Sequence, residues 1–85
     1  MFYVYCLESI KNGKLYIGYA DNLKRRFKEH NDGIGGDFTA KNGPWKLIFY
    51  EGHISKRDAQ RMEKFYKSGY GREVLRDKLK YYFEK

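Results

Sequence analysis

The stretch KLYIGYADNLKRRFKEHN, from Lys14 to Asn31, joins an extended segment directly to a helix and sets the order of elements in the first half of the chain. Its segment from Leu15 to Tyr19 is rich in aromatic and β-branched residues, which favours a strand. Asp21 follows as the expected N-cap of a helix that runs to the end of the stretch. Leu23 and Phe27 lie four residues apart on that helix and mark its buried face. The stretch therefore predicts a strand followed at once by an amphipathic helix.

A second strand is predicted before this stretch, because Phe2 to Leu7 is also aromatic and β-branched. Between the two strands lies KNGK, at residues 11–14, whose Asn-Gly pair is a strong hairpin signal since both residues tolerate positive φ. If the loop is symmetric about this pair, odd positions of the first strand share a face with even positions of the second. Tyr5 and Tyr16 are then expected on one face of the sheet. A loop with an odd number of residues would separate them.

The second half of the chain predicts one more strand and two more helices. The segments are a loop at residues 33–44, a strand from Trp45 (WKLIFYEG), a helix opened by the capping box SKRD at residues 55–58, and a helix at about residues 72–83 after SGYG. Eighty-five residues leave room for one core, so residues 1–85 are expected to form a single domain. The predicted fold is α/β (α+β), a small three-stranded antiparallel sheet flanked by about three helices in the order β-β-α-β-α-α.

The chain is strongly basic and rich in aromatic residues. Its formal net charge is +7 at pH 7, and aromatic residues make up 19% of it. This charge favours a polyanionic partner, with nucleic acid first and an anionic membrane surface second. No apolar stretch approaches the roughly 20 residues that cross a bilayer, and the N-terminal MFYVYCLES lacks the features of a signal peptide. We therefore expect a soluble, cytoplasmic protein that binds nucleic acid and no membrane.

Two basic residues sit at the edge of the buried face of the first helix. Arg26 and His30 are four residues apart and fall within about 60° of Leu23 on a helical wheel, close to the bare Gly18. An arginine there can hold a phosphate bidentately, and a histidine beside it can carry a proton. The alternative interpretation is two solvated basic residues with no role in a site.

Three further residues have both a structural and a chemical interpretation. Glu63 lies about 40° from Ala59 on its helix, so a partly buried carboxylate is expected there. It could form a salt bridge, or it could bind one Mg²⁺, whose octahedron water and substrate phosphate can complete. Tyr5 and Tyr16 could be core tyrosines, or phenols that accept a proton or orient a nucleophile. The chemical interpretations together suit phosphodiester hydrolysis.

Several motifs resemble those of one enzyme family. YVY at residues 3–5, followed eleven residues after its last tyrosine by YIG at residues 16–18, resembles the signature of the GIY-YIG nuclease family. DNLKRRFKEHN resembles that family's helix with its arginine and histidine, and AQRMEKFYKSGYG its metal-binding glutamate helix. GREVLRDKL is similar to the tail of the small stand-alone bacterial members, which are related to the N-terminal nuclease domain of the UvrC repair protein.

The resemblance implies a role for each candidate residue. Tyr5 would help deprotonate or position the attacking water, and Tyr16 would support it as a hydrogen-bonding phenol. Arg26 would stabilise the pentavalent phosphate with His30 beside it, and Glu63 would bind the single metal ion.

The implied function is a metal-dependent endonuclease that uses one Mg²⁺ or Mn²⁺ to hydrolyse phosphodiester bonds in nucleic acid, expected to be DNA. DNA repair is the implied process, and a partner protein could supply targeting. Two departures from the family pattern leave an alternative open. Tyr3 replaces the first glycine of the signature, and no asparagine follows Asn42, whereas many members have one downstream of the glutamate. The alternative is a catalytically weak or inactive nucleic-acid-binding module on the same fold.

Overall fold

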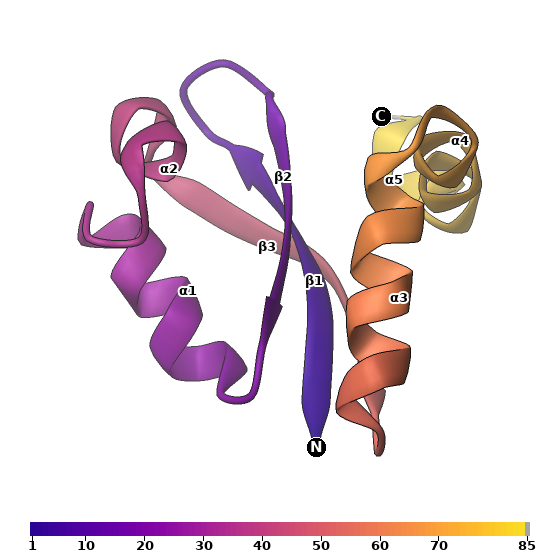
Figure 1. Cartoon of the computed structure of the whole chain (residues 1–85). Coiled ribbons are helices and arrows are strands. Elements are labelled where there is room, and N and C mark those ends of the chain that lie inside the picture. The colour runs from indigo at the N-terminus through magenta and orange to yellow at the C-terminus, as the bar shows by residue number, and fades with distance from the viewer. Residues whose placement is uncertain (85) are drawn as a thin grey trace.

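β1 (Phe2–Ser9), β2 (Leu15–Ala20) and β3 (Trp45–His53) form one antiparallel sheet in the computed structural model, which describes residues 1–84 (Figure 1). The strand order is β2-β1-β3, so β1 is central and the other two are edge strands. Side chains of β1 are buried on both faces of the sheet, which explains why its sequence is almost continuously apolar and does not alternate. The predicted three-stranded antiparallel sheet is confirmed.

The hairpin between β1 and β2 puts Tyr5 and Tyr16 on one face as predicted, but its loop is centred one residue before the Asn-Gly pair and not on it. The backbone N–H of Ser9 donates to the carbonyl of Lys14 at 2.8 Å and closes the loop around the Asn-Gly pair. Tyr5 then pairs with Gly18 across the two strands. Because paired residues share a face, Tyr5 and Tyr16 lie on the same side of the sheet, with ring centroids 6.4 Å apart.

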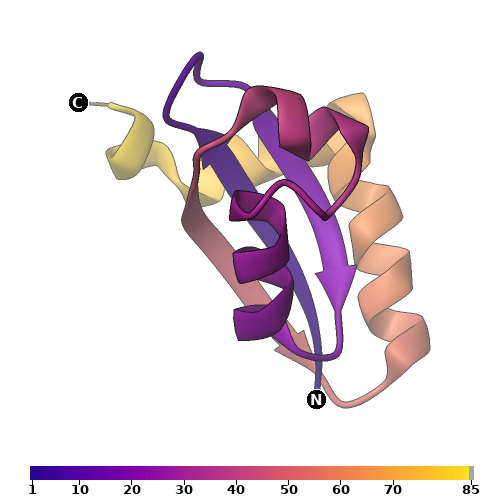
Figure 2. The same ribbon diagram turned by 90° about the vertical axis from the view of Figure 1, so that its left-hand side faces the viewer.

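The helices form a layer on each face of the sheet (Figures 1 and 2). α1 (Leu23–Asn31) and α2 (Asp37–Asn42) cover one face, and α3 (Lys56–Lys67), α4 (Gly69–Lys78) and α5 (Lys80–Phe83) cover the other. None of the helices in the described part of the chain has the length and apolarity required to cross a membrane. The β2 edge therefore runs between two helical layers.

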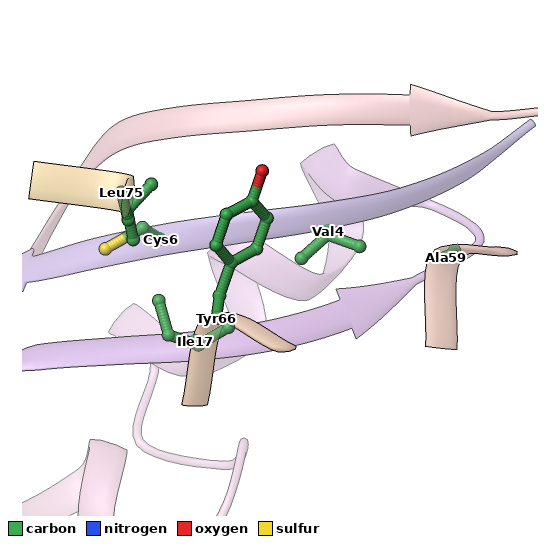
Figure 3. Packing of buried hydrophobic residues seen from close by; sticks show 6 residues of the cluster. All are labelled: Val4, Cys6, Ile17, Ala59, Tyr66 and Leu75. Carbon is green, nitrogen blue, oxygen red and sulfur yellow. The ribbon is translucent and has the colours of Figure 1, made fainter. Parts of the chain in front are cut away.

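Each face of the sheet has its own buried cluster. The cluster under α3 and α4 consists of Val4, Cys6, Ile17, Ala59, Tyr66 and Leu75 (Figure 3). The cluster under α1 consists of Tyr5, Leu7, Ala20 and Trp45, with partly buried side chains from α1 packed against it. Ala59 and Tyr66 are the buried residues of α3, so this side of the helix faces the sheet.

Three expectations about the helices are wrong. The N-cap of α1 is Asn22 and not Asp21, because the Asn22 side chain accepts the N–H of Arg25 at 3.0 Å while the Asp21 carboxylate pairs with the Arg25 guanidinium. The segment expected to be a loop at residues 33–44 contains α2, and the helix expected at residues 72–83 is divided into α4 and α5. Five helices are thus present in the described residues instead of about three.

The helix break expected at SGYG consists of one residue, Ser68, which caps the end of α3 and the start of α4. The hydroxyl of Ser68 donates to the carbonyl of Phe65 at the end of α3 and accepts the N–H of Gly71 in the first turn of α4. A Cβ on Gly71 would collide with the backbone of Phe65. The glycine therefore lets α4 begin one residue after the cap.

Candidate active site

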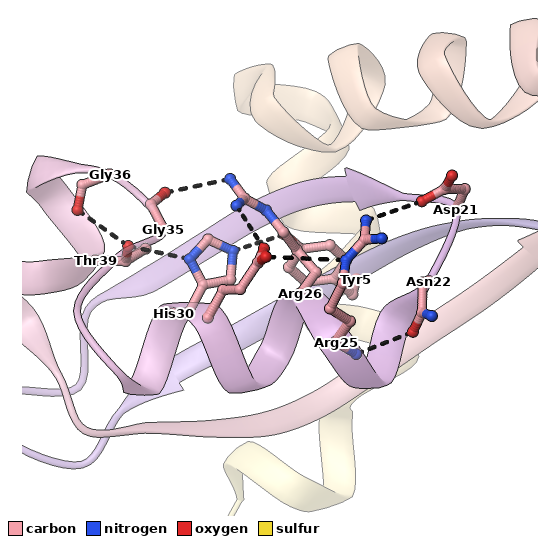
Figure 4. A network of polar contacts seen from close by, with 10 residues as sticks. Tyr5, Asp21, Asn22, Arg25, Arg26, His30, Gly35, Gly36 and Thr39 are labelled. Atoms are coloured by element: carbon pink, nitrogen blue, oxygen red, sulfur yellow. Dashed lines mark hydrogen bonds and ion pairs between the residues drawn. The ribbon is translucent and has the colours of Figure 1, made fainter.

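Four of the five predicted site residues lie together on the face of the sheet that α1 covers. Tyr5 comes from β1, and Arg26 and His30 come from α1 (Figure 4). Tyr16 comes from β2. The ring centroid of Tyr16 lies 5.0 Å from that of His30. His30 is only 1% exposed, so it is buried more deeply than its place at the edge of the helical wheel suggests.

A chain of hydrogen bonds runs inward from Tyr5. The Tyr5 hydroxyl lies 2.8 Å from Nε2 of His30, and Nδ1 of His30 lies 3.0 Å from the hydroxyl of Thr39 on α2. The Thr39 hydroxyl donates its one proton to the carbonyl of Gly36 at 3.3 Å. It must therefore accept the bond from His30, which places the imidazole proton on Nδ1.

The electrostatics of His30 favour its neutral form. Burial, together with the positive charge of Arg26, lowers the pKa of His30, against a smaller opposite effect of Glu29. With Nδ1 protonated and Nε2 free in the neutral imidazole, the Tyr5 hydroxyl is the donor in the Tyr5–His30 bond. Burial also raises the pKa of Tyr5 well above its usual value, although the charge of Arg26 acts in the opposite direction. Near neutral pH the pair is thus a phenol that donates to an imidazole.

The guanidinium of Arg26 is fixed beside this chain by two contacts. One terminal nitrogen forms an ion pair with the Glu29 carboxylate at 3.0 Å, and the other donates to the carbonyl of Gly35 at 3.2 Å (Figure 4). The side chain is 32% exposed and faces an open pocket of about 350 Å³, which Lys56 also lines. Arg26 is therefore both held in place and accessible to an anion.

Glu63 lies apart from the other four residues. It is on α3, whereas Arg26 is on α1, and these helices lie on opposite sides of the edge strand β2 (Figure 1). The Glu63 carboxylate accepts from Lys67 at 3.1 Å, and its side chain is 25% exposed. No hydrogen bond joins Glu63 to the other predicted site residues within residues 1–84. Burial and the charge of Tyr16 raise the pKa of Tyr5 most, and the charge of Glu63 adds a smaller increase.

A metal ion at this site would depend on Glu63. Across the described residues, no group of three His, Cys, Asp or Glu side chains is arranged to hold a metal. One carboxylate nevertheless fits Mg²⁺, because this ion keeps several waters and takes substrate phosphate oxygens as ligands. Glu63 lines an open pocket of about 500 Å³ with Arg57, Arg61 and Lys64, whose charges would attract a phosphate.

Thr39 and Gly35 belong to the site but are not predicted from the sequence. Thr39 is 1% exposed and fixes the His30 tautomer, while the carbonyl of Gly35 holds Arg26. A Cβ on Gly35 would collide with the His30 ring. Both residues lie in the segment expected to be a loop, and the run GIGG is its only hint of a close approach.

Gly18 makes room for the Tyr5 phenol. A Cβ at this position would collide with both Cζ and the hydroxyl oxygen of Tyr5, whose ring lies across the glycine. The strand therefore needs a glycine here for packing, and the Tyr5 hydroxyl could not keep its position next to a larger residue.

Gly18→Ala should destabilise the protein by about 1–3 kcal/mol, because the buried Tyr5 ring must shift. For a domain of this size each kcal/mol lowers the melting temperature by roughly 4–8 °C. Gly69→Ala is the matched control, since a Cβ there meets no atom within 4 Å. Thermal melting followed by circular dichroism measures both. A melting temperature for Gly18→Ala equal to that of Gly69→Ala would contradict the packing of Tyr5 against β2.

Comparison with known proteins identifies relatives of this chain. The chain is 43% identical over 67 residues to the UPF0213 protein CPE1444 of Clostridium perfringens, a match that covers 79% of this chain and 71% of that protein. It is 36% identical over 74 residues to the UPF0213 protein YazA of Bacillus subtilis, which covers 87% of this chain and 70% of that protein.

A solved structure supports the same assignment. The solution NMR structure of the UPF0213 protein BH0048 from Bacillus halodurans is similar with a TM-score of 0.54 at 38% sequence identity, over 88% of this chain and 82% of that one. Residues 1–78 match the GIY-YIG catalytic domain. The predicted resemblance is confirmed, and the chain belongs to the GIY-YIG family.

Proposed function

We propose that the protein is a metal-dependent endonuclease that hydrolyses phosphodiester bonds in nucleic acid, with DNA as the expected substrate. The observation that carries this proposal is the buried hydrogen-bond chain from Tyr5 through His30 to Thr39, beside the anchored guanidinium of Arg26. Membership of a nuclease family supports it. A folded core does not require a neutral imidazole that accepts from a phenol next to a basic pocket, whereas such a pair can move a proton in the hydrolysis of a phosphate ester.

Tyr5 and His30 can together remove a proton from an attacking water. Because the pKa of Tyr5 is raised, the phenolate is scarcely populated near neutral pH and cannot serve as a resident base. The Tyr5 oxygen can instead accept a proton from water while its own proton passes to Nε2 of His30. The resulting imidazolium keeps its Nδ1–H bond to Thr39. The hydroxide formed attacks phosphorus, the bond to the leaving oxygen breaks, and that oxygen takes a proton from solvent.

Arg26 would stabilise the charge that develops on the phosphate. Its contacts with Glu29 and Gly35 fix the plane of the guanidinium before substrate arrives, so little reorganisation is needed in the transition state. Tyr16, packed against both Tyr5 and His30, would hold their rings in place. The role of Arg26 is the one that the family resemblance implies, whereas Tyr16 would act here through ring packing and not as the hydrogen-bonding phenol that the resemblance implies.

Glu63 would hold one Mg²⁺ or Mn²⁺ through its carboxylate. When bound, the ion would supply positive charge to the phosphate and to the leaving oxygen. The position of Glu63 across β2 from Arg26 means that the phosphate would lie over the edge of the sheet, between the two helical layers.

Two observations favour the binding-only alternative. Glu63 is a single carboxylate, already paired with Lys67, and the sequence has no asparagine after Asn42. A module of this kind would keep the basic surface and bind nucleic acid without cutting it.

Labelled duplex, flap and single-stranded DNA, incubated with the purified protein, separate the two functions. The endonuclease should cut at least one substrate with Mg²⁺ or Mn²⁺ and none with EDTA. The matching RNA strands test the preference for DNA. Binding of these substrates with no cleavage in either metal would establish the alternative.

A further inference from the structure

A pocket of about 490 Å³ lies next to the candidate active site, at the start of β2. It is lined by the end of the hairpin loop, by Phe38 of α2 and by α4. Ile17 is one of its lining residues and lies between Tyr16 and Gly18 in β2. Lys14 is two residues before Tyr16, about 7 Å along the strand. A strand of nucleic acid that occupies the active site and continues along the β2 edge would therefore reach this pocket.

Three cations converge on the pocket without a counter-charge. Lys14, Arg72 and Arg76 all line it and are all exposed. Within residues 1–84 no carboxylate forms an ion pair with any of them, whereas both Arg25 and Arg26 are paired. Arg72 and Arg76 lie four residues apart on α4, a spacing at which like charges repel, although the Arg76 guanidinium also lies 4.9 Å from the centroid of the Phe83 ring. The arrangement suits an anion with several oxygens.

Phe38 adds an aromatic surface to the same pocket. Its ring is 43% exposed and is supported from within by stacking on Tyr16, with centroids 6.1 Å apart and an interplanar angle of 25°. The ring centroid of Trp45 lies 5.9 Å from that of Phe38, in a tilted arrangement. The ring is thus an exposed apolar group held by two aromatic neighbours, next to a cluster of cations. Base stacking on an aromatic side chain combined with phosphate contacts is the usual way to bind a single strand.

We propose that this pocket binds an unpaired nucleotide of the substrate strand, with its phosphate on Lys14, Arg72 and Arg76 and its base on Phe38. The inference rests on the proposed function and adds a substrate class to it. A base in a duplex is already stacked and paired, so it cannot also stack on Phe38 without leaving the helix. The preferred substrate is therefore nucleic acid that is single-stranded on one side of the cleaved bond, as in a flap or a branch.

Binding without cleavage tests the pocket directly. The probes are a fluorescein-labelled eight-residue oligothymidylate and a hairpin duplex of matched charge, titrated by anisotropy with EDTA present. Phe38→Leu keeps apolar volume but loses the aromatic face, and should weaken binding of the single strand roughly 5- to 100-fold. Phe38→Tyr keeps the face and should retain binding. Neither variant should change binding of the duplex by more than a small factor.

The arginine pair has a matched control on α1. The double variant Arg72→Gln/Arg76→Gln should bind the single strand at least tenfold more weakly and lower the dependence of log affinity on log salt by about 1 to 2. Lys24→Gln/Lys28→Gln removes the same charge at the same spacing on α1 and should have a much smaller effect. Circular dichroism of all four variants checks that they are folded.

Three results would overturn the inference. Equal loss in the two double variants would mean that only net charge matters. Loss with Arg72→Gln/Arg76→Gln but full binding by Phe38→Leu would indicate an anion site without base recognition. Wild-type protein that binds duplex as tightly as single strand would remove the substrate preference. Because these measurements need no metal and no cleavage, they stay informative if the protein proves not to be a nuclease, and a nuclease could fail all of them.

Discussion

Glu63→Gln should abolish metal-dependent cleavage while leaving the fold and nucleic-acid binding nearly unchanged. Glutamine has the shape of glutamate but no anionic oxygen, so it cannot hold a hard divalent cation as the carboxylate would. The loss to stability is small, because the Glu63–Lys67 pair is an i, i+4 contact near the surface, typically worth about 0.3–0.5 kcal/mol. Single-turnover cleavage with Mg²⁺ and circular dichroism measure the two effects.

Glu73→Gln is the control for this substitution. It removes the same charge from an exposed position on α4 and should cleave at the wild-type rate. Wild-type cleavage by Glu63→Gln with Mg²⁺ would remove Glu63 as the ligand and strengthen the binding-only alternative.

Arg26→Lys should reduce the cleavage rate on the order of 10²-fold or more, as for other preorganised transition-state donors. Lysine keeps the charge but cannot reach two phosphate oxygens with one planar fork, and it would also give up one of the contacts that fix the guanidinium. The partly buried Leu23 and Phe27 anchor α1, so the free energy of unfolding should change by only about 1 kcal/mol, the value of one hydrogen bond.

Arg25→Lys is the internal control for Arg26. Its side chain is 59% exposed and pairs with Asp21 and Glu29, about 100° around the helix from its neighbour. Single-turnover cleavage and thermal melting of the two variants should be compared side by side. Equal, mild losses would count against the role of Arg26. A large loss of cleavage rate for Arg25→Lys alone would show that Arg25, and not Arg26, contacts the phosphate.

The sequence predicts most of what local patterns control. The Asn-Gly pair predicts the hairpin, and the even number of loop residues puts Tyr5 and Tyr16 on one face, although the observed register is shifted from one symmetric about that pair. Helical spacing places Arg26 and His30 next to the Leu23–Phe27 stripe, and the packing of α1 on that face brings all four together.

Features that depend on tertiary packing cannot be predicted from local sequence patterns. Asp21 and Asn22 are both good N-caps, and only the path of the chain out of β2 decides between them. Thr39 approaches His30 because α2 folds back over α1, and no periodicity in GIGGDFTAKN signals this. The helical wheel correctly predicts a partly buried Glu63, but not that a sheet edge separates it from Arg26.

The central claim is that the bond from Tyr5 to His30 carries the proton of the attacking water. Its most direct test is the pH dependence of single-turnover cleavage by wild type and Tyr5→Phe. Tyr66→Phe is the control, because Tyr66 is an equally buried phenol, 1% exposed, that donates to Glu51 on the other face.

The sign of the pH effect follows from His30, whose pKa is lowered by burial and by Arg26. The neutral imidazole is present above its usual pKa of about 6.5 and is lost as the pH falls through the lowered value in the folded protein. Cleavage by wild type should therefore decline only as the pH falls through this lowered pKa. The free energy of unfolding should begin to decline earlier, as the pH falls below about 6.5, where the unfolded chain starts to bind the proton. Tyr5→Phe should be about 10²- to 10⁴-fold slower at neutral pH, while Tyr66→Phe should keep the wild-type rate. Cleavage by folded Tyr5→Phe at the rate of Tyr66→Phe, with the same acid limb as wild type, would contradict the account.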